Sequence, residues 1–124
     1  MSKYHITIPG RLTGLNEYIA AERTNRYKAA ALKRDSQGYV CVYIRKCLRN
    51  VHIAKPVKLR YTWHEPNRKR DLDNVASFGH KVIQDALKEC RVITDDSPKY
   101  VVGFSDEFRV DKNNPRIEVE IEEV

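Results

Sequence analysis

Two aspartates one residue apart, directly after a run of three cations, are the residues of this sequence best suited to chemistry. Asp71 and Asp73 follow Arg68, Lys69 and Arg70, between a predicted strand and a predicted helix. An extended backbone places residues i and i+2 on the same side, so the two carboxylates would repel each other unless a cation lay between them. Carboxylate oxygens are the ligands that Mg²⁺ and Mn²⁺ prefer. The pattern indicates a divalent-cation site beside phosphate-binding cations, although a capping aspartate and a surface aspartate paired with the arginines would give the same residues.

A second acidic pair, Asp95 and Asp96, lies in a polar turn over residues 94–98. Aspartate and serine are common in turns because their side chains bond to the local backbone, so ordinary turn chemistry explains the pair equally well. If the turn folds back beside the start of the preceding helix, a third carboxylate joins Asp71 and Asp73. Three carboxylates around a cation form the kind of site that hydrolyses phosphodiesters with the help of a metal.

The charge is divided unevenly along the chain. Residues 1–70 contain 16 Lys and Arg against 4 Asp and Glu, whereas residues 71–124 contain 7 against 13, for a net charge of +6. A basic half could neutralise phosphates and an acidic half could bind cations, which suits a metal-dependent enzyme acting on nucleic acid. Two ordinary solvated surfaces would give the same composition.

Length and composition exclude several classes of protein. The 124 residues suffice for one domain, residues 1–124, but not for two catalytic units. The sequence has neither a membrane-spanning stretch nor a secretory signal, so we expect a cytoplasmic protein with no membrane partner. The three cysteines lack the spacing of a zinc site or a disulfide framework. A nucleotide-binding enzyme is disfavoured because the sequence has no glycine-rich phosphate loop.

Apolar residues recur with helical period in two segments. The first predicts a long helix from about Thr24 to Arg49, in which Gly38 marks either a kink or a break. The second predicts a helix of about four turns that begins near Val75, with Asp73 or Asn74 as its cap. Its apolar positions are Val75, Phe78, Val82, Ile83, Ala86, Leu87 and Cys90.

Apolar and polar residues alternate in the segments that separate these helices. The alternation predicts one strand from Tyr4 to Pro9 and another from Val57 to Trp63. A closing hairpin is predicted at the end of the sequence, with strands from Tyr100 to Phe104 and from Ile117 to Ile121 joined by turn residues 111–115. The order strand, helix, strand, helix, hairpin predicts an α/β (α+β) fold with a single mixed sheet packed against helices.

The order and spacing of these residues resemble the RusA family of Holliday junction resolvases. The matching residues are Arg68-Lys69-Arg70-Asp71-Leu72-Asp73-Asn74, then Lys81, then Asp85-Ala86-Leu87, then Asp95-Asp96. The similarity extends to the opening strand, to Gly14-Leu15-Asn16-Glu17-Tyr18 with its basic helix, and to the closing hairpin. The resemblance implies a homodimer that cuts four-way DNA junctions with Mg²⁺ or Mn²⁺. We expect no nucleotide cofactor, because the sequence has no glycine-rich phosphate loop.

The same resemblance assigns roles to individual residues. Asp71, Asp73 and Asp96 correspond to three essential carboxylates that bind the metal, and Lys81 corresponds to a catalytic lysine. The DNA contacts of the family correspond to Arg68, Lys69 and Arg70.

Lys81 departs from the family pattern, because the lysine of the best-known branch follows the acidic pair by one helical turn. Here it comes eight residues after Asp73, or about 12 Å along a helix. A surface ammonium paired with Asp85 would explain Lys81 equally well. His80 is a rival proton-transfer group, although an ordinary solvated histidine is the simpler interpretation.

A non-catalytic module that binds DNA or its junctions is the alternative function. The basic half alone would serve such a module. The acidic residues distinguish the two, because carboxylates beside a phosphate-binding surface would repel DNA unless a cation lay between them.

Overall fold

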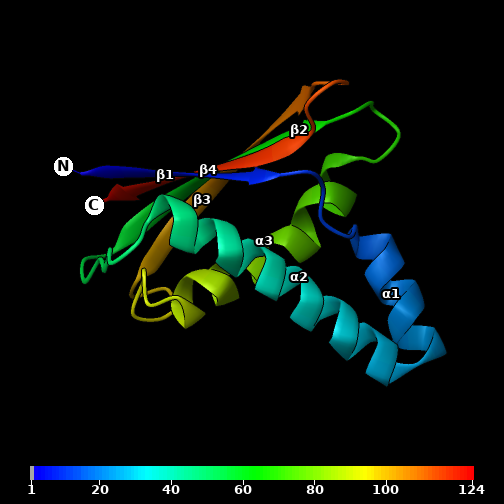
Figure 1. Ribbon diagram of the computed structural model, residues 1–124, viewed down its shortest axis with the longest axis horizontal. Coiled ribbons are helices and arrows are strands. Elements are labelled where there is room, and N and C mark those ends of the chain that lie inside the picture. The colour runs from blue at the N-terminus through cyan, green and yellow to red at the C-terminus, as the bar shows by residue number, and fades with distance from the viewer. Residues whose placement is uncertain (1) are drawn as a thin grey trace.

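The computed structural model describes residues 2–124 and forms one mixed sheet with helices packed on one of its faces (Figure 1). The strands are β1 (Lys3–Pro9), β2 (Val57–Glu65), β3 (Val101–Val110) and β4 (Arg116–Glu123). The helices are α1 (Leu15–Thr24), α2 (Arg26–Cys47) and α3 (Leu72–Glu89). The strand order is β1-β4-β2-β3, with β2 and β3 parallel and the other pairs antiparallel. The predicted fold class is confirmed.

The predicted hairpin is wrong, because β3 and β4 do not pair with each other. β4 lies between β1 and β2, and β3 pairs with the other edge of β2. The burial of the strands explains this arrangement. Ile117, Val119 and Ile121 give β4 a fully buried face that suits a central strand, whereas Val102 and Phe104 of β3 remain about half exposed. Within residues 2–124, β3 pairs only with β2, so its outer edge is free.

The first predicted helix begins and breaks at different residues from those expected. The break lies at Asn25, between α1 and α2, and the side chain of Asn25 caps α2 by accepting from the backbone N–H of Tyr27 at 2.8 Å. Gly38 lies within the continuous α2 and has no neighbouring atoms on its outer side. The helix α1 was missed, because Ala21 is its only buried residue and its hydrophobic pattern is weak.

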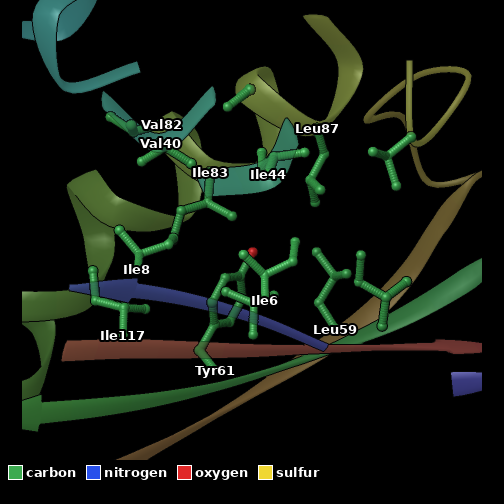
Figure 2. Close-up of a cluster of buried hydrophobic side chains, with 14 of the residues drawn as sticks. Ile6, Ile8, Val40, Ile44, Leu59, Tyr61, Val82, Ile83, Leu87 and Ile117 are labelled. Atoms are coloured by element: carbon green, nitrogen blue, oxygen red, sulfur yellow. The ribbon is translucent and has the colours of Figure 1, made fainter. Parts of the chain in front are cut away.

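The core lies between the helices and the sheet, where β1, β2 and β4 meet α2 and α3 (Figure 2). A close approach of α3 to the sheet requires Gly79, since a Cβ atom there would lie 2.5 Å from the indole ring of Trp63. The opposite face of the sheet is open and charged; Lys3, Lys58 and Arg60 are exposed on it, and Lys3 and Arg60 pair with Glu120.

Across residues 2–124, none of the helices has the length and apolar character needed to cross a membrane. The cysteines are free, and Cys41 is buried in the core.

Candidate active site

The acidic pair lies where the chain leaves β2 and enters α3. Asp71 is the N-cap of α3, and its Oδ1 accepts a hydrogen bond from the backbone N–H of Asn74 at 2.8 Å. The cap was therefore expected two or three residues too late. Asp73 lies in the first turn, and both carboxylates are exposed. The cap engages one oxygen of Asp71 and leaves Asp73 without a capping role, so both retain oxygens for a further ligand.

The first turn of α3 also fixes the start of α1. The side-chain oxygen of Asn74 accepts from the backbone N–H of Asn16 at 2.8 Å. Gly14, immediately before α1, allows this approach, because a Cβ atom there would lie 2.8 Å from both Asn74 Oδ1 and Arg70 Nη1. The helix that sequence periodicity missed thus supports the segment that carries the acidic pair.

A buried ion pair holds the segment before Asp71. The side chain of Glu65, 5% exposed, lies at the end of β2 and accepts from Arg70 Nη2 at 2.9 Å and from Arg11 Nη2 at 2.7 Å. Arg70 also donates to the backbone carbonyl of Leu12 at 3.3 Å. Burial alone would raise the pKa of Glu65, but the hydrogen bonds from Arg11 and Arg70 outweigh it and hold the pKa below its usual value.

The three consecutive cations therefore differ in their surroundings. The Arg70 side chain is 14% exposed and engaged in the protein interior. Arg68 and Lys69 are exposed, and within residues 2–124 neither has a carboxylate within ion-pair distance. Arg68 and Lys69 are free to meet a phosphate, whereas Arg70 anchors the backbone that carries Asp71.

Asp96 does not fold back beside the start of α3. It lies 3.5 Å from Lys81, which also pairs with Asp85 at 3.2 Å, and Asp95 pairs with Lys88 in the last turn. The parallel arrangement of β2 and β3 explains this placement. Because α3 begins where β2 ends, the chain must return to the opposite end of the sheet before β3 begins. Residues 94–98 therefore lie beside the later turns of α3.

Lys81 and Asp96 form a mixed-charge cluster with Asp85 and Lys33. Lys33 Nζ lies 2.7 Å from Asp85. Asp85 raises the pKa of Lys81, with a smaller contribution from Asp96, so the ammonium stays charged at neutral pH. Burial would raise the pKa of Asp85, but hydrogen bonds from Lys33 and Lys81 keep it lowered. The expected pairing of Lys81 with Asp85 is present, and the side chain of Lys81 remains 63% exposed.

His80 is not the solvated histidine that the sequence suggested. Its Nε2 lies 2.7 Å from Asp106 of β3, and its side chain is 19% exposed. The same Asp106 oxygen accepts from the indole N–H of Trp63 at 2.8 Å. The rings of Tyr61 and Phe104 lie 4.8 Å and 4.3 Å from the imidazole. This packing gives His80 a structural role between α3 and β3.

The sequence analysis did not identify two carboxylates that anchor the surroundings of the site, Glu65 and Asp106. Glu65 and Asp106 each occupy a strand position that faces the helices. The available signal was a charged residue at a position where the alternation predicts an apolar one. A buried charge needs a partner, so such a residue indicates an ion pair or hydrogen bond in the interior.

The described residues do not complete a metal site within one chain. Across residues 2–124, no three of the side chains of His, Cys, Asp and Glu come together in a group that could hold a metal ion. Asp71 and Asp73 supply the hard oxygen donors that suit Mg²⁺ or Mn²⁺. Arg68 and Lys69, just before them, are exposed and can meet a phosphate, whereas the two carboxylates would repel it unless a cation lay between.

Comparison with known proteins gives one family. The sequence profile described as Endodeoxyribonuclease RusA matches the chain over residues 9–122. No individual curated protein matches it at a significant level. The matched range includes the acidic pair, the cations before it, Lys81 and Asp96. The chain therefore belongs to the RusA family of endodeoxyribonucleases.

Proposed function

We propose that this protein is a metal-dependent, structure-selective endonuclease that resolves four-way DNA junctions by paired phosphodiester cleavage. The observation that carries the proposal is the exposed pair Asp71 and Asp73 beside Arg68 and Lys69, two exposed cations that have no ion-pair partner among residues 2–124. These features occur in a chain that matches an endodeoxyribonuclease family over nearly its whole length.

Each group has a separate task in the proposed reaction. Asp71, Asp73 and Asp96 would hold Mg²⁺ or Mn²⁺, which when bound would supply Lewis-acid activation of the phosphate and of the attacking water. Arg68 and Lys69 bind backbone phosphates, which positions the DNA without reading its sequence. The Lys81 ammonium stabilises negative charge that develops on the phosphate. In place of the DNA contact that the resemblance implies, we propose a positioning role for Arg70, since it holds the segment through Glu65.

A homodimer resolves the separation of Asp96 from the acidic pair. Lys81, which contacts Asp96, lies about 12 Å along α3 from Asp73. β3 has a free edge, along which Val102, Phe104 and Val110 are exposed. Two copies paired antiparallel along this edge would form an isologous interface around a two-fold axis.

The direction of β3 decides what such a dimer brings together. Val110 is paired with Glu65, so the loop that leads to Asp71 lies at the C-terminal end of β3. Asp96 precedes the N-terminal end of β3. An antiparallel pair of β3 strands therefore brings Asp96 of one copy toward Asp71 and Asp73 of the other. Two composite sites would result, one for each of two symmetric nicks.

Asp73→Asn separates binding from cleavage. Because Asp71 is the cap, removing the charge of Asp73 leaves the cap of α3 intact. The change removes an anionic metal ligand and a charge that repels phosphate, so cleavage should be lost while junction binding is retained or tighter. The test is cleavage of a synthetic four-way junction and of linear duplex in Mg²⁺, with metal-free gel-shift binding in parallel. Wild-type protein that binds junctions without cutting them would favour the non-catalytic module.

Mixing two inactive variants tests the composite site. Asp73→Asn and Asp96→Asn homodimers should both be inactive. A mixed dimer would keep one intact site, formed by the acidic pair of one copy and Asp96 of the other, so mixing should restore single nicks. If each site were built within one chain, the mixture would stay inactive. Light scattering of Phe104→Glu should show a monomer.

A further inference from the structure

A basic hollow lies at the end of the molecule remote from Asp71. Its volume is about 750 Å³, within the usual range for ligand pockets. It is formed where α2 and α3 end, and the segments after the two helices are joined by the bridge between Ile53 and Ile93. Its apolar floor includes Ile44 and Leu48. The basic residues that line it are Arg45, Lys46, Arg49, His52 and Arg91.

The charge of the hollow is unbalanced. No acidic residue lines it, and within residues 2–124 none of its arginines and lysines has a carboxylate within 4.0 Å. Cations near the ends of two helices offset the helix dipoles, but a helix C-terminus carries only about half a negative charge. Two helix ends therefore account for about one of the four permanent positive charges. The remaining three favour an anionic ligand.

The backbone of Arg91 supports the same conclusion. Arg91 follows the C-cap of α3 with φ of 60°, a left-handed conformation that favours glycine at this position. His52 Nδ1 lies 2.7 Å from the carbonyl oxygen of Arg91, so this ring nitrogen carries the proton and donates to it. The chain thus places an arginine where glycine would fit with less strain. Strained residues of this kind are concentrated at functional sites.

We propose that this hollow binds phosphates of a duplex DNA arm, as a second DNA contact separate from the cleavage site. The proposal rests on the function proposed above. Three arginines favour phosphate, because the planar guanidinium group binds its oxygens through paired hydrogen bonds. An acidic peptide also carries negative charges that these cations could bind. DNA is the ligand we propose because the chain belongs to a family of endodeoxyribonucleases.

The length of α3 sets the reach of the contact. Cys90, at the edge of the hollow, lies nine residues beyond Lys81 and 19 beyond Asp71. These separations correspond to about 14 Å and about 28 Å along the helix. At 3.4 Å per base pair the phosphates concerned lie roughly four to eight base pairs from the branch point.

The test is metal-free binding of four-way junctions, measured by fluorescence anisotropy over a range of salt concentrations. The variants are Arg45→Gln/Arg49→Gln/Arg91→Gly and, in case the triple variant unfolds, Arg91→Gly alone. The control, Lys3→Gln/Lys58→Gln/Arg60→Gln, removes the same charge from the open face of the sheet. Losing three phosphate contacts should reduce the slope of log affinity against log salt by about 2.7, and losing one by about 0.9. Arg91→Gly should melt at an equal or higher temperature than wild type.

Neutral methylphosphonates placed four to eight base pairs from the branch point locate the contact. They should lower the junction affinity of the wild type and leave that of the triple variant unchanged. In Arg91→Gly, the loss of affinity that they cause should be smaller than in wild type. Equal penalties in all proteins, or equal losses in variant and control, would overturn the proposal. So would unchanged DNA binding together with loss of binding to a polyglutamate peptide, which would assign the hollow to an acidic protein. A wild type that shows the expected penalties but does not cut junctions in Mg²⁺ would refute the proposed function alone.

Discussion

Arg68 and Arg70 are two residues apart, yet their replacement by alanine should have opposite consequences. Arg70 donates to Glu65 through Nε and Nη2, at 3.1 Å and 2.9 Å, and to the carbonyl of Leu12. Arg68 is exposed and within residues 2–124 has no ion-pair partner. Arg70→Ala should destabilise the fold, whereas Arg68→Ala should weaken DNA binding.

The magnitude follows from the burial of Glu65. Removing one partner of a buried ion pair costs about 3 to 5 kcal/mol because a charge is left uncompensated. Here Arg11 remains bonded to Glu65 through two nitrogens, and its own side chain is 38% exposed. The loss is then nearer to that of one or two hydrogen bonds to a charged group, so we expect about 2 to 3 kcal/mol of unfolding free energy.

Urea denaturation measures the loss of stability expected in Arg70→Ala, and metal-free junction binding measures the loss of DNA affinity expected in Arg68→Ala. Arg68→Ala should change the unfolding free energy by no more than about 0.5 kcal/mol, as is usual for exposed positions. It should also lower the salt slope of binding by about 0.9, the value for one phosphate contact. Arg70→Ala should leave the slope unchanged. A change of less than about 0.5 kcal/mol in Arg70→Ala, together with a reduced slope, would refute the positioning role and return Arg70 to the DNA contacts.

Three further predictions follow from single residues. Because the pKa of Glu65 is lowered in the folded protein, its ionised form contributes stability above about pH 4.3, the pKa of Glu in the unfolded chain. This stability is lost as the pH falls through the pKa in the folded state. The loss of stability with falling pH, followed by circular dichroism, should therefore be less steep in Glu65→Gln than in wild type. Lys81→Gln should reduce cleavage but change thermal stability little, because its side chain is 63% exposed, and Lys81→Arg should restore part of the rate if charge is what matters. Gly79→Ala should cost about 1 to 3 kcal/mol through overpacking against Trp63, and urea denaturation equal to wild type would contradict that contact.

Local patterns in the sequence were sufficient for several features. The apolar period of α3 and the alternation of β1 and β2 predicted these elements and the faces they bury. These patterns are reliable because each element must bury one face of its own. The position of the acidic pair between a strand and a helix followed directly, as did membership of the family.

Other features depend on contacts between residues distant in sequence. No local pattern distinguishes Arg68 from Arg70, since only Glu65 and the carbonyl of Leu12 decide which is buried. Likewise, β4 pairs with β1 and β2 rather than with β3, because its apolar face is fully buried and suits a central position in the sheet.

The candidate active site shows the same division. The sequence by itself determined the chemistry of the site, in the form of hard anionic oxygens beside cations. The tertiary structure alone decided that Asp96 lies beside Lys81 rather than Asp73. The physical reason is the parallel pairing of β2 and β3, which requires the chain to cross the full length of the sheet between the two acidic pairs. Strand direction is set by the packing of the whole sheet and leaves no signal in the residues of a turn.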